Sequence, residues 1–196
     1  MAAEKHALVA FGANLDFGDL SPERTILTAI AALGRAGFLI DRSSKLYATP
    51  CFPAGFGPDY VNAAAIIPLR QGQTAAGLLA TLHKIESDFG RERLQRWGMR
   101  TLDIDLLAVG DSILPDLATY RRWQLLAVDQ HRLATPDDLI LPHPRLQDRA
   151  FVLVPLADIA PDWRHPVLGQ SVRQMLAALP QSDRDSVVAL TPSPFA

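Results

Sequence analysis

The pattern of apolar and polar residues predicts strands in four parts of the chain. Residues 6–11 and 60–69 are apolar, β-prone runs, and residues 38–48 have strand character as well. Between residues 101 and 109, apolar side chains alternate with Asp103 and Asp105, and a period of two is typical of a strand with two different faces. This last strand is unusual because one of its faces carries carboxylates.

Helical patterns lie between these strands and near the end of the chain. Residues 21–23 place a capping Ser, a Pro at the first helical position and an acid in the first turn, and apolar residues follow at helical spacing. We expect this helix to end at Gly34 or Gly37. The apolar spacing predicts a second helix over residues 74–89 and a short one over residues 171–179.

The irregular order of these elements favours an α+β fold over a doubly wound sheet, since one strand exposes a polar face. Residues 111–138 have no clear pattern and are long for a connection, so we interpret them as an insertion of unknown conformation. The chain of 196 residues is then one domain over residues 1–196, with a frayed tail from about residue 191.

Composition excludes several classes of protein. The single cysteine, Cys51, allows no disulfide framework and no four-thiolate metal site, so we expect a reducing cytoplasm. No run approaches the roughly 20 apolar residues of a membrane span, and the first residues do not form a signal peptide. The net charge is −2, but only three of the 19 basic residues are Lys. An Arg bias can reflect base composition alone, so the positions of the arginines matter more than their number.

Asp103 and Asp105 point to a metal site. Side chains at positions i and i+2 leave a strand on the same face, about 7 Å apart along the backbone. Two like charges on one face repel each other, and a bound cation removes the repulsion. Mg²⁺ suits this arrangement because one or two carboxylates often hold it together with substrate phosphates. An edge strand with a solvated polar face is the alternative interpretation.

A basic segment directly precedes this strand. Arg91, Arg93, Arg96 and Arg100 stand there with Glu92 as the only acid, so four arginines less one glutamate give a local charge of +3. Guanidinium groups held close together repel one another unless they bind a multiply anionic ligand. Arginines beside a cation site meet the needs of a polyphosphate, because both neutralise its charge during transfer. Phosphoryl or nucleotidyl transfer is therefore the favoured class of reaction.

The common phosphate-binding motifs are absent from the sequence. It contains no G-x-x-x-x-G-K-[ST], and residues 12–14 do not complete G-x-G-x-x-G, so neither a P-loop nor a Rossmann site is supported. The five histidines lack the spacing of a zinc site, and only His143 is held in place, between two prolines. Two alternatives stay open: a magnesium-dependent nucleotidyltransferase, and a non-catalytic nucleotide- or RNA-binding module. The aromatic signature of an RNA-recognition strand is absent, which weakens the last of these.

Several blocks of the chain form an ordered set of motifs. They are FGANL at 11–15, YATP at 47–50, DYVNA at 59–63, GRER at 90–93, RWGMRTLDIDLL at 96–107, LPHPR at 141–145 and RAFVL at 149–153. Together they resemble the hydroxymethyldihydropterin pyrophosphokinase family of folate biosynthesis, and the block at 96–107 is the most specific. The resemblance implies transfer of the terminal two phosphates of ATP, as one unit, to the hydroxymethyl oxygen of the pterin, with release of AMP. It also implies a ferredoxin-like α/β sandwich with a mainly antiparallel central sheet flanked by helices.

The same resemblance implies roles for individual residues. Asp103 and Asp105 correspond to ligands of two Mg²⁺ ions and, with Arg91, Arg93 and Arg100, to the catalytic residues. The pterin site corresponds to Thr49, Pro50, Phe52, Tyr60, Asn62 and Phe151. The contacts to ATP correspond to His83, Glu86, Arg93, Trp97, Arg100, His143 and Arg149. Without the resemblance, core packing would be the preferred interpretation of Tyr60 and Phe151.

The chain departs from the family pattern at a few places. Cys51, Phe52 and Pro144 replace more usual residues, and residues 111–138 are longer than the usual connection. None of these changes removes an expected metal ligand or loop arginine, although they affect the expected shape of the pterin pocket. We expect only small-molecule partners, ATP and hydroxymethyldihydropterin, with no nucleic acid and no membrane. A monomer is the favoured state, and an oligomer stays possible.

Overall fold

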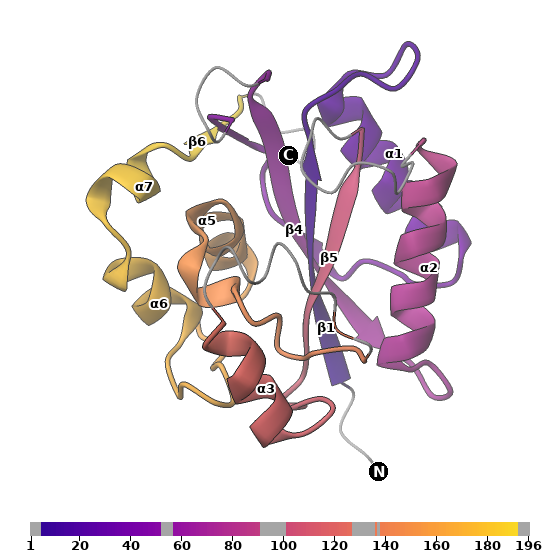
Figure 1. Ribbon diagram of the computed structural model, residues 1–196. Helices are drawn as coiled ribbons and strands as arrows, with labels where there is room; N and C mark the ends of the chain where they lie inside the picture. Colours follow the sequence, from indigo (N-terminus) through magenta and orange to yellow (C-terminus); the bar gives the residue numbers. More distant parts are fainter. Residues whose placement is uncertain (1–4, 52–56, 91–100, 127–135, 137, 192–196) are drawn as a thin grey trace.

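A six-stranded sheet with helices on both of its faces forms the framework of the protein (Figure 1). The computed structural model describes residues 5–51, 57–90, 101–126, 136 and 138–191. The strand pairings in this part are antiparallel, and the order is β5-β1-β4-β3-β6, with β2 paired to β4. The strands are β1 (Lys5–Ala13), β2 (Arg42–Ser43), β3 (Tyr47–Thr49), β4 (Tyr60–Leu69), β5 (Asp103–Val109) and β6 (Val188–Ala189).

β1 and β4 form the centre of the sheet because both are apolar on their two faces. Val9 and Phe11 of β1 belong to the cluster that packs with α1 (Pro22–Arg35) and α2 (Ala75–Asp88). Leu8 of β1 and Ala64 of β4 belong to a second cluster, which packs with α5 (Ala150–Ile159). Figure 1 shows α1 and α2 on one side of the sheet and α5 on the other. This arrangement confirms the expected α+β fold with an antiparallel sheet, and the order is the ferredoxin-like β-α-β-β-α-β when the short β2 and β3 are counted as one strand.

Three of the four predicted strands are confirmed, and the fourth is divided. β2 and β3 stand where the pattern predicts one strand over residues 38–48. Ser44 lies between them, and its Oγ accepts the backbone N–H of Ala64 at 2.9 Å. Because a side-chain hydroxyl takes the place of a backbone acceptor, the ladder is interrupted at this residue. β5 begins at Asp103, two residues after the predicted start.

The predicted helices are confirmed, with one correction at a cap. Ser21 is the residue before α1, but its Oγ donates to Glu23 Oε2 at 2.6 Å and caps no backbone N–H. The expectation of a capping hydroxyl there is therefore wrong. Thr74 does cap α2, since its Oγ1 accepts from Gly77 N at 3.0 Å. Ser171 caps α6 (Val172–Ala178) through reciprocal bonds with Gln174.

β5 changes its register against β1 near the middle of both strands. Val9 pairs with Leu106, whereas Leu8 pairs with Ala108, so Leu107 is one extra residue on β5. Leu107 and Ala108 both belong to the cluster beneath α5. This bulge separates the part of β5 that carries the two aspartates from its apolar end.

Part of the predicted insertion is a helix, α3 (Leu117–Gln124), which follows the cap residue Asp116. Tyr120 of α3 is fully buried, and its hydroxyl lies 3.0 Å from Nε2 of His165. Residues 127–135 and 137 of the insertion lie outside the described residues, as does the predicted frayed tail beyond residue 191. The pattern assigns no element to η1 (Leu146–Asp148), α5, α7 (Gln181–Asp185) or β6.

No helix within the described residues is both long enough and apolar enough to cross a membrane.

His165 joins α3 to the segment before α6. Its Nδ1 accepts the N–H groups of Val167 and Leu168, both at 3.2 Å, so the ring proton lies on Nε2 and is donated to the Tyr120 hydroxyl. Burial lowers the pKa of His165 to about 4, because a charged ring at this position would lose its hydration.

The free energy of unfolding should therefore fall as the pH decreases from 6.5, the ordinary pKa of histidine, to about 4. In this window the unfolded chain binds a proton at His165 that the folded chain does not, so the contribution is up to about 1.4 kcal/mol per pH unit. Urea denaturation across this range measures the slope. His165→Gln, which does not titrate, should lower the slope, whereas Tyr120→Phe should retain it. Equal slopes in the wild type and His165→Gln would contradict this assignment.

Candidate functional site

A row of four residues crosses the sheet near the end of β1. Asp103 on β5 pairs with Gly12 on β1, Gly12 pairs with Asn62 on β4, and Asn62 pairs with Tyr47 on β3. Directly paired residues leave a sheet on the same face, so these four positions share one face. It is the face that α5 covers farther along the strands. The row therefore brings residues of four separate sequence motifs together.

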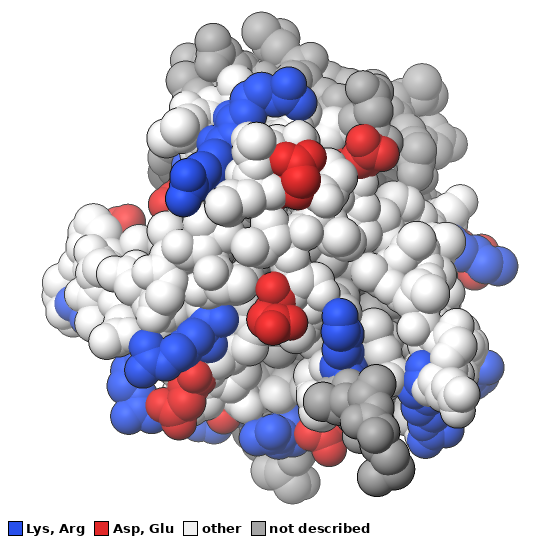
Figure 2. Space-filling view, turned by 90° about the horizontal axis from the view of Figure 1, so that it is seen from below, with Lys and Arg blue, Asp and Glu red and all other residues white. Residues whose placement is uncertain are grey.

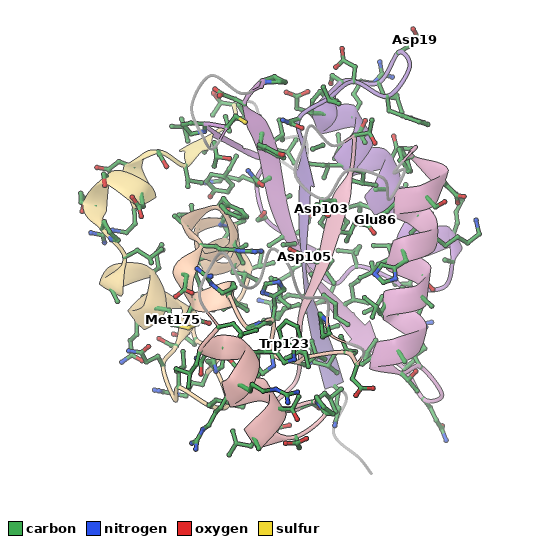
Figure 3. The ribbon with its side chains drawn as sticks, in the orientation of Figure 1. Asp19, Glu86, Asp103, Asp105, Trp123 and Met175 are labelled. Carbon is green, nitrogen blue, oxygen red and sulfur yellow. The ribbon has the colours of Figure 1, made fainter. Side chains whose placement is uncertain are left out.

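Asp105 stands in the next row of the same face. It pairs with Ala10, and Ala10 pairs with Ala64, which packs in the cluster beneath α5. Asp103 and Asp105 are partly exposed, whereas Ile104 between them is buried on the opposite face. The predicted common face for the two carboxylates is thus present. Figure 3 shows them one after the other along β5.

Arg149 approaches the site from the start of α5. Its Nη1 lies 3.4 Å from Oδ2 of Asp105, and the two side chains are 30% and 35% exposed. Its guanidinium carbon also lies over the Phe151 ring, 5.7 Å from the centre of the ring. Arg149 thus contacts both a carboxylate of β5 and an aromatic ring of α5.

Two groups bind the outer edge of β5, the edge opposite β1. Oε1 of Glu86, on α2, accepts the backbone N–H of Ile104 at 2.8 Å, and Glu86 is only 2% exposed. The backbone N–H of His143 donates to the carbonyl of Leu107 at 2.7 Å. Figure 3 shows Glu86 between α2 and β5. An edge strand normally leaves such groups unpaired, so these bonds fix β5 in place.

Steric hindrance explains why position 12 of the row is a glycine. An added Cβ at Gly12 would lie 3.3 Å from Oδ1 of Asn62, closer than most side-chain contacts. Asn62 is itself held, since its Nδ2 donates to Oγ1 of Thr49 at 2.7 Å and both residues are buried. Glycine inside a strand often marks such a close approach, and this signal was available in the sequence.

The aromatic residues of the row and of the expected pterin site differ in burial. Phe151 is 41% exposed, which is inconsistent with the core packing that would otherwise be the preferred interpretation, and Tyr60 is partly exposed. Tyr47 is buried, and its hydroxyl donates to Oδ2 of Asp158 on α5 at 2.7 Å. Burial, with the hydrogen bond and charge of Asp158, raises the pKa of Tyr47. This bond ties β3 to α5, and the alternation of residues along the chain does not predict it.

The remaining predicted residues are placed as follows. His83 lies exposed on α2, Pro50 is exposed after β3, and His143 is partly exposed, with its Nδ1 accepting the N–H of Arg145 at 3.1 Å. Five predicted site residues lie outside the described part of the chain: Phe52, Arg91, Arg93, Trp97 and Arg100.

The aspartate pair fits a hard divalent cation. The described residues contain no group of three or more His, Cys, Asp or Glu that could hold a metal. Two partly exposed carboxylates on one face are nevertheless the usual protein share of a Mg²⁺ site completed by phosphates and water. The guanidinium of Arg149 near Asp105 indicates that this position accepts a cation.

The family model described as 7,8-dihydro-6-hydroxymethylpterin-pyrophosphokinase (HPPK) matches residues 8–161. The 2-amino-4-hydroxy-6-hydroxymethyldihydropteridine pyrophosphokinase of Synechocystis sp. is 41% identical over 149 residues, which are 76% of this chain and 65% of that protein. The protein of the same name from Pseudomonas aeruginosa is 37% identical over 174 residues, 88% of this chain and 90% of that one. This chain thus spans just under two thirds of the first relative and most of the second.

Solved structures agree with the fold. A crystal structure of Plasmodium falciparum HPPK-DHPS A437G with SDX-DHP superimposes with a TM-score of 0.61 at 14% sequence identity. The match covers 89% of this chain and 45% of that one.

Two substitutions of Glu86 should distinguish how much its hydrogen bond and its charge each contribute to the free energy of unfolding. Glu86→Ala leaves the buried N–H of Ile104 without this acceptor and should lower the free energy of unfolding by about 1–3 kcal/mol. Glu86→Gln keeps an oxygen at the same position and should lose clearly less. Urea denaturation measures both values, and equal losses in the two variants would show that the bond to β5 is unimportant.

Proposed function

The chain belongs to the 7,8-dihydro-6-hydroxymethylpterin-pyrophosphokinase family, and from that premise we propose that it transfers the terminal diphosphate of ATP to hydroxymethyldihydropterin. The products are AMP and the pterin diphosphate, an intermediate of tetrahydrofolate biosynthesis. The observation that carries the proposal is the Asp103–Gly12–Asn62 row, which places a carboxylate and an amide on one face of the sheet. Two strand spacings separate the carboxylate from the amide, a distance of about 10 Å.

The two ends of the row suit the two substrates. Asn62 can pair with the edge of a pterin ring through its Oδ1 and its second N–H, because Thr49 takes only one of its donors. The exposed ring of Phe151 and the partly exposed Tyr60 offer flat apolar faces. We assign Thr49, Pro50, Phe52, Tyr60, Asn62 and Phe151 to the pterin site.

Asp103 and Asp105 would hold two Mg²⁺ ions at the other end of the row, together with the phosphates of ATP. Bound Mg²⁺ would neutralise the triphosphate and orient it. The residues assigned to the nucleotide are His83, Glu86, Arg93, Trp97, Arg100, His143 and Arg149. Of these, Glu86 would act indirectly, by holding β5 in place, since its buried carboxylate accepts the backbone N–H of Ile104.

Catalysis in this site would depend on positioning and electrostatics. Gly12 has no side chain between the carboxylate of Asp103 and the amide of Asn62, so the hydroxymethyl oxygen of the pterin would approach the transferred phosphate above this residue. Arg91, Arg93 and Arg100 would stabilise the charge that develops on the phosphate oxygens and exclude water. Asp103 and Asp105 would keep the diphosphate at its end of the row.

We propose that the chain acts on small molecules alone. Figure 2 shows one face of the molecule, where basic and acidic side chains are interspersed among uncharged ones, and its described part carries no continuous basic stripe of the kind that binds nucleic acid. We propose a monomer as the functional state. The single cysteine favours a reducing cytoplasm.

The nature of the product tests the proposed reaction. With Mg²⁺, ATP and hydroxymethyldihydropterin, the chain should release AMP in equal amount to the pterin diphosphate, as measured by anion-exchange chromatography. Asp103→Ala should reduce this rate by about 100-fold or more. Release of pyrophosphate would instead indicate a nucleotidyltransferase. Pterin-independent formation of ADP would contradict the proposal, and RNA binding without ATP binding would favour the non-catalytic module.

Gly12→Ala should weaken binding of the pterin more than binding of ATP. The added methyl group would lie 3.3 Å from Oδ1 of Asn62 and would displace this amide by a few tenths of an ångström. We expect the KM for the pterin to rise about three- to tenfold, with a smaller change in the KM for ATP. Gly34→Ala is the matched control, because nothing lies within 4 Å of a Cβ added there. An unchanged KM for the pterin would show that this contact does not shape the site.

A further inference from the structure

We infer that Arg149 is an internal counter-ion for Asp105 that competes with the metal. In the free protein its guanidinium holds the carboxylate, and it gives up this partner when the metal and nucleotide bind. The inference rests on the proposed function, because it takes Asp105 as a metal ligand. It goes further by assigning Arg149 opposite effects on metal binding and nucleotide binding.

The contact between the two residues is well suited to exchange. Its length of 3.4 Å exceeds the about 2.7–2.9 Å of a short charge-assisted hydrogen bond. Both side chains are about one third exposed, so water can replace either partner at low cost. A structural ion pair would be expected to be shorter and more deeply buried.

The surroundings of Arg149 explain why its guanidinium lies at this position. Arg149 is the residue before α5, and its side chain caps no backbone group of that helix. The guanidinium carbon also lies over the ring of Phe151, 5.7 Å from its centre, and this contact does not involve Asp105. Phe151 can therefore keep Arg149 near the site after Asp105 is released.

The two negative charges on β5 explain why the ion pair between Arg149 and Asp105 should affect metal binding. Asp103 and Asp105 leave the strand on one face, and their mutual repulsion is reduced when a positive group lies near one of them. Arg149 supplies that group before a metal arrives. A divalent cation at Asp105 must then overcome both the lost ion pair and the repulsion from the guanidinium. When the triphosphate binds, its anionic oxygens offer Arg149 a stronger bidentate partner than Asp105 does. Arg149 then releases Asp105, and the carboxylate can bind the metal.

Direct measurement of metal binding without nucleotide tests the inference. Mn²⁺ serves as the probe, and the electron paramagnetic resonance signal of free Mn²⁺ gives its dissociation constant for the full chain. Arg149→Met should bind Mn²⁺ about two- to fivefold more tightly than the wild type, which corresponds to loss of a partly exposed ion pair. The same variant should bind a non-hydrolysable ATP analogue with Mg²⁺ more weakly. Arg149→Lys, which keeps the charge, should stay near the wild type in Mn²⁺ affinity.

Arg145→Met is the matched control. Arg145 lies in the same segment and carries the same charge, but it pairs with Asp148 at 2.8 Å. Its loss should leave Mn²⁺ affinity unchanged, so equal tightening in Arg145→Met and Arg149→Met would overturn the inference in favour of a general charge effect. Arg149→Gln replaces Arg149→Met if the latter does not fold.

Two results separate this inference from the proposed function. If Arg149→Met binds Mn²⁺ no more tightly than the wild type, while Asp105→Asn abolishes binding, the metal site stands and the competition by Arg149 is wrong. If Asp105→Asn binds Mn²⁺ as the wild type does, with and without the ATP analogue, the metal assignment itself is wrong.

Discussion

The antiparallel register of β1 against β4 and β5 is the constraint on which the site depends. One residue, Gly12, faces Asn62 on one side and Asp103 on the other, so a single position on β1 aligns both halves of the site. A slip of one residue would turn the aspartates towards the core beneath α1 and α2 and replace them with Ile104. Burying two carboxylates among apolar side chains is very costly, so the register and the site are specified by the same side chains.

β5 is held from both of its edges, although it lies at the end of the sheet. β1 pairs with its inner edge, while Glu86 and the backbone of His143 bind its outer edge. The buried carboxylate of Glu86 thus supports the strand from the side opposite the partly exposed carboxylates. A strand held in this way can present two like charges without moving to relieve their repulsion. The arrangement provides the preorganisation that transfer of a highly charged group requires.

The sequence predicts most of the central fold and only part of the site. Alternation along residues 101–109 identifies β5 and the common face of its aspartates, because this signal is local. α5 was not predicted, because it is apolar on nearly every side and shows no helical periodicity. The bond from Glu86 to Ile104 and that from Tyr47 to Asp158 join distant residues, so no local pattern encodes them. Resemblance indicated that Glu86 matters, but only the fold shows that its carboxylate supports β5.

The bulge at Leu107 has a consequence for how this chain can vary in length. The extra residue uncouples the two ends of β5, so a shift in the apolar end is absorbed there and does not reach the aspartates. The long segment over residues 111–138 is attached downstream of this point. A change in chain length after β5 would therefore leave the pairing of Asp103 and Asp105 with β1 unchanged.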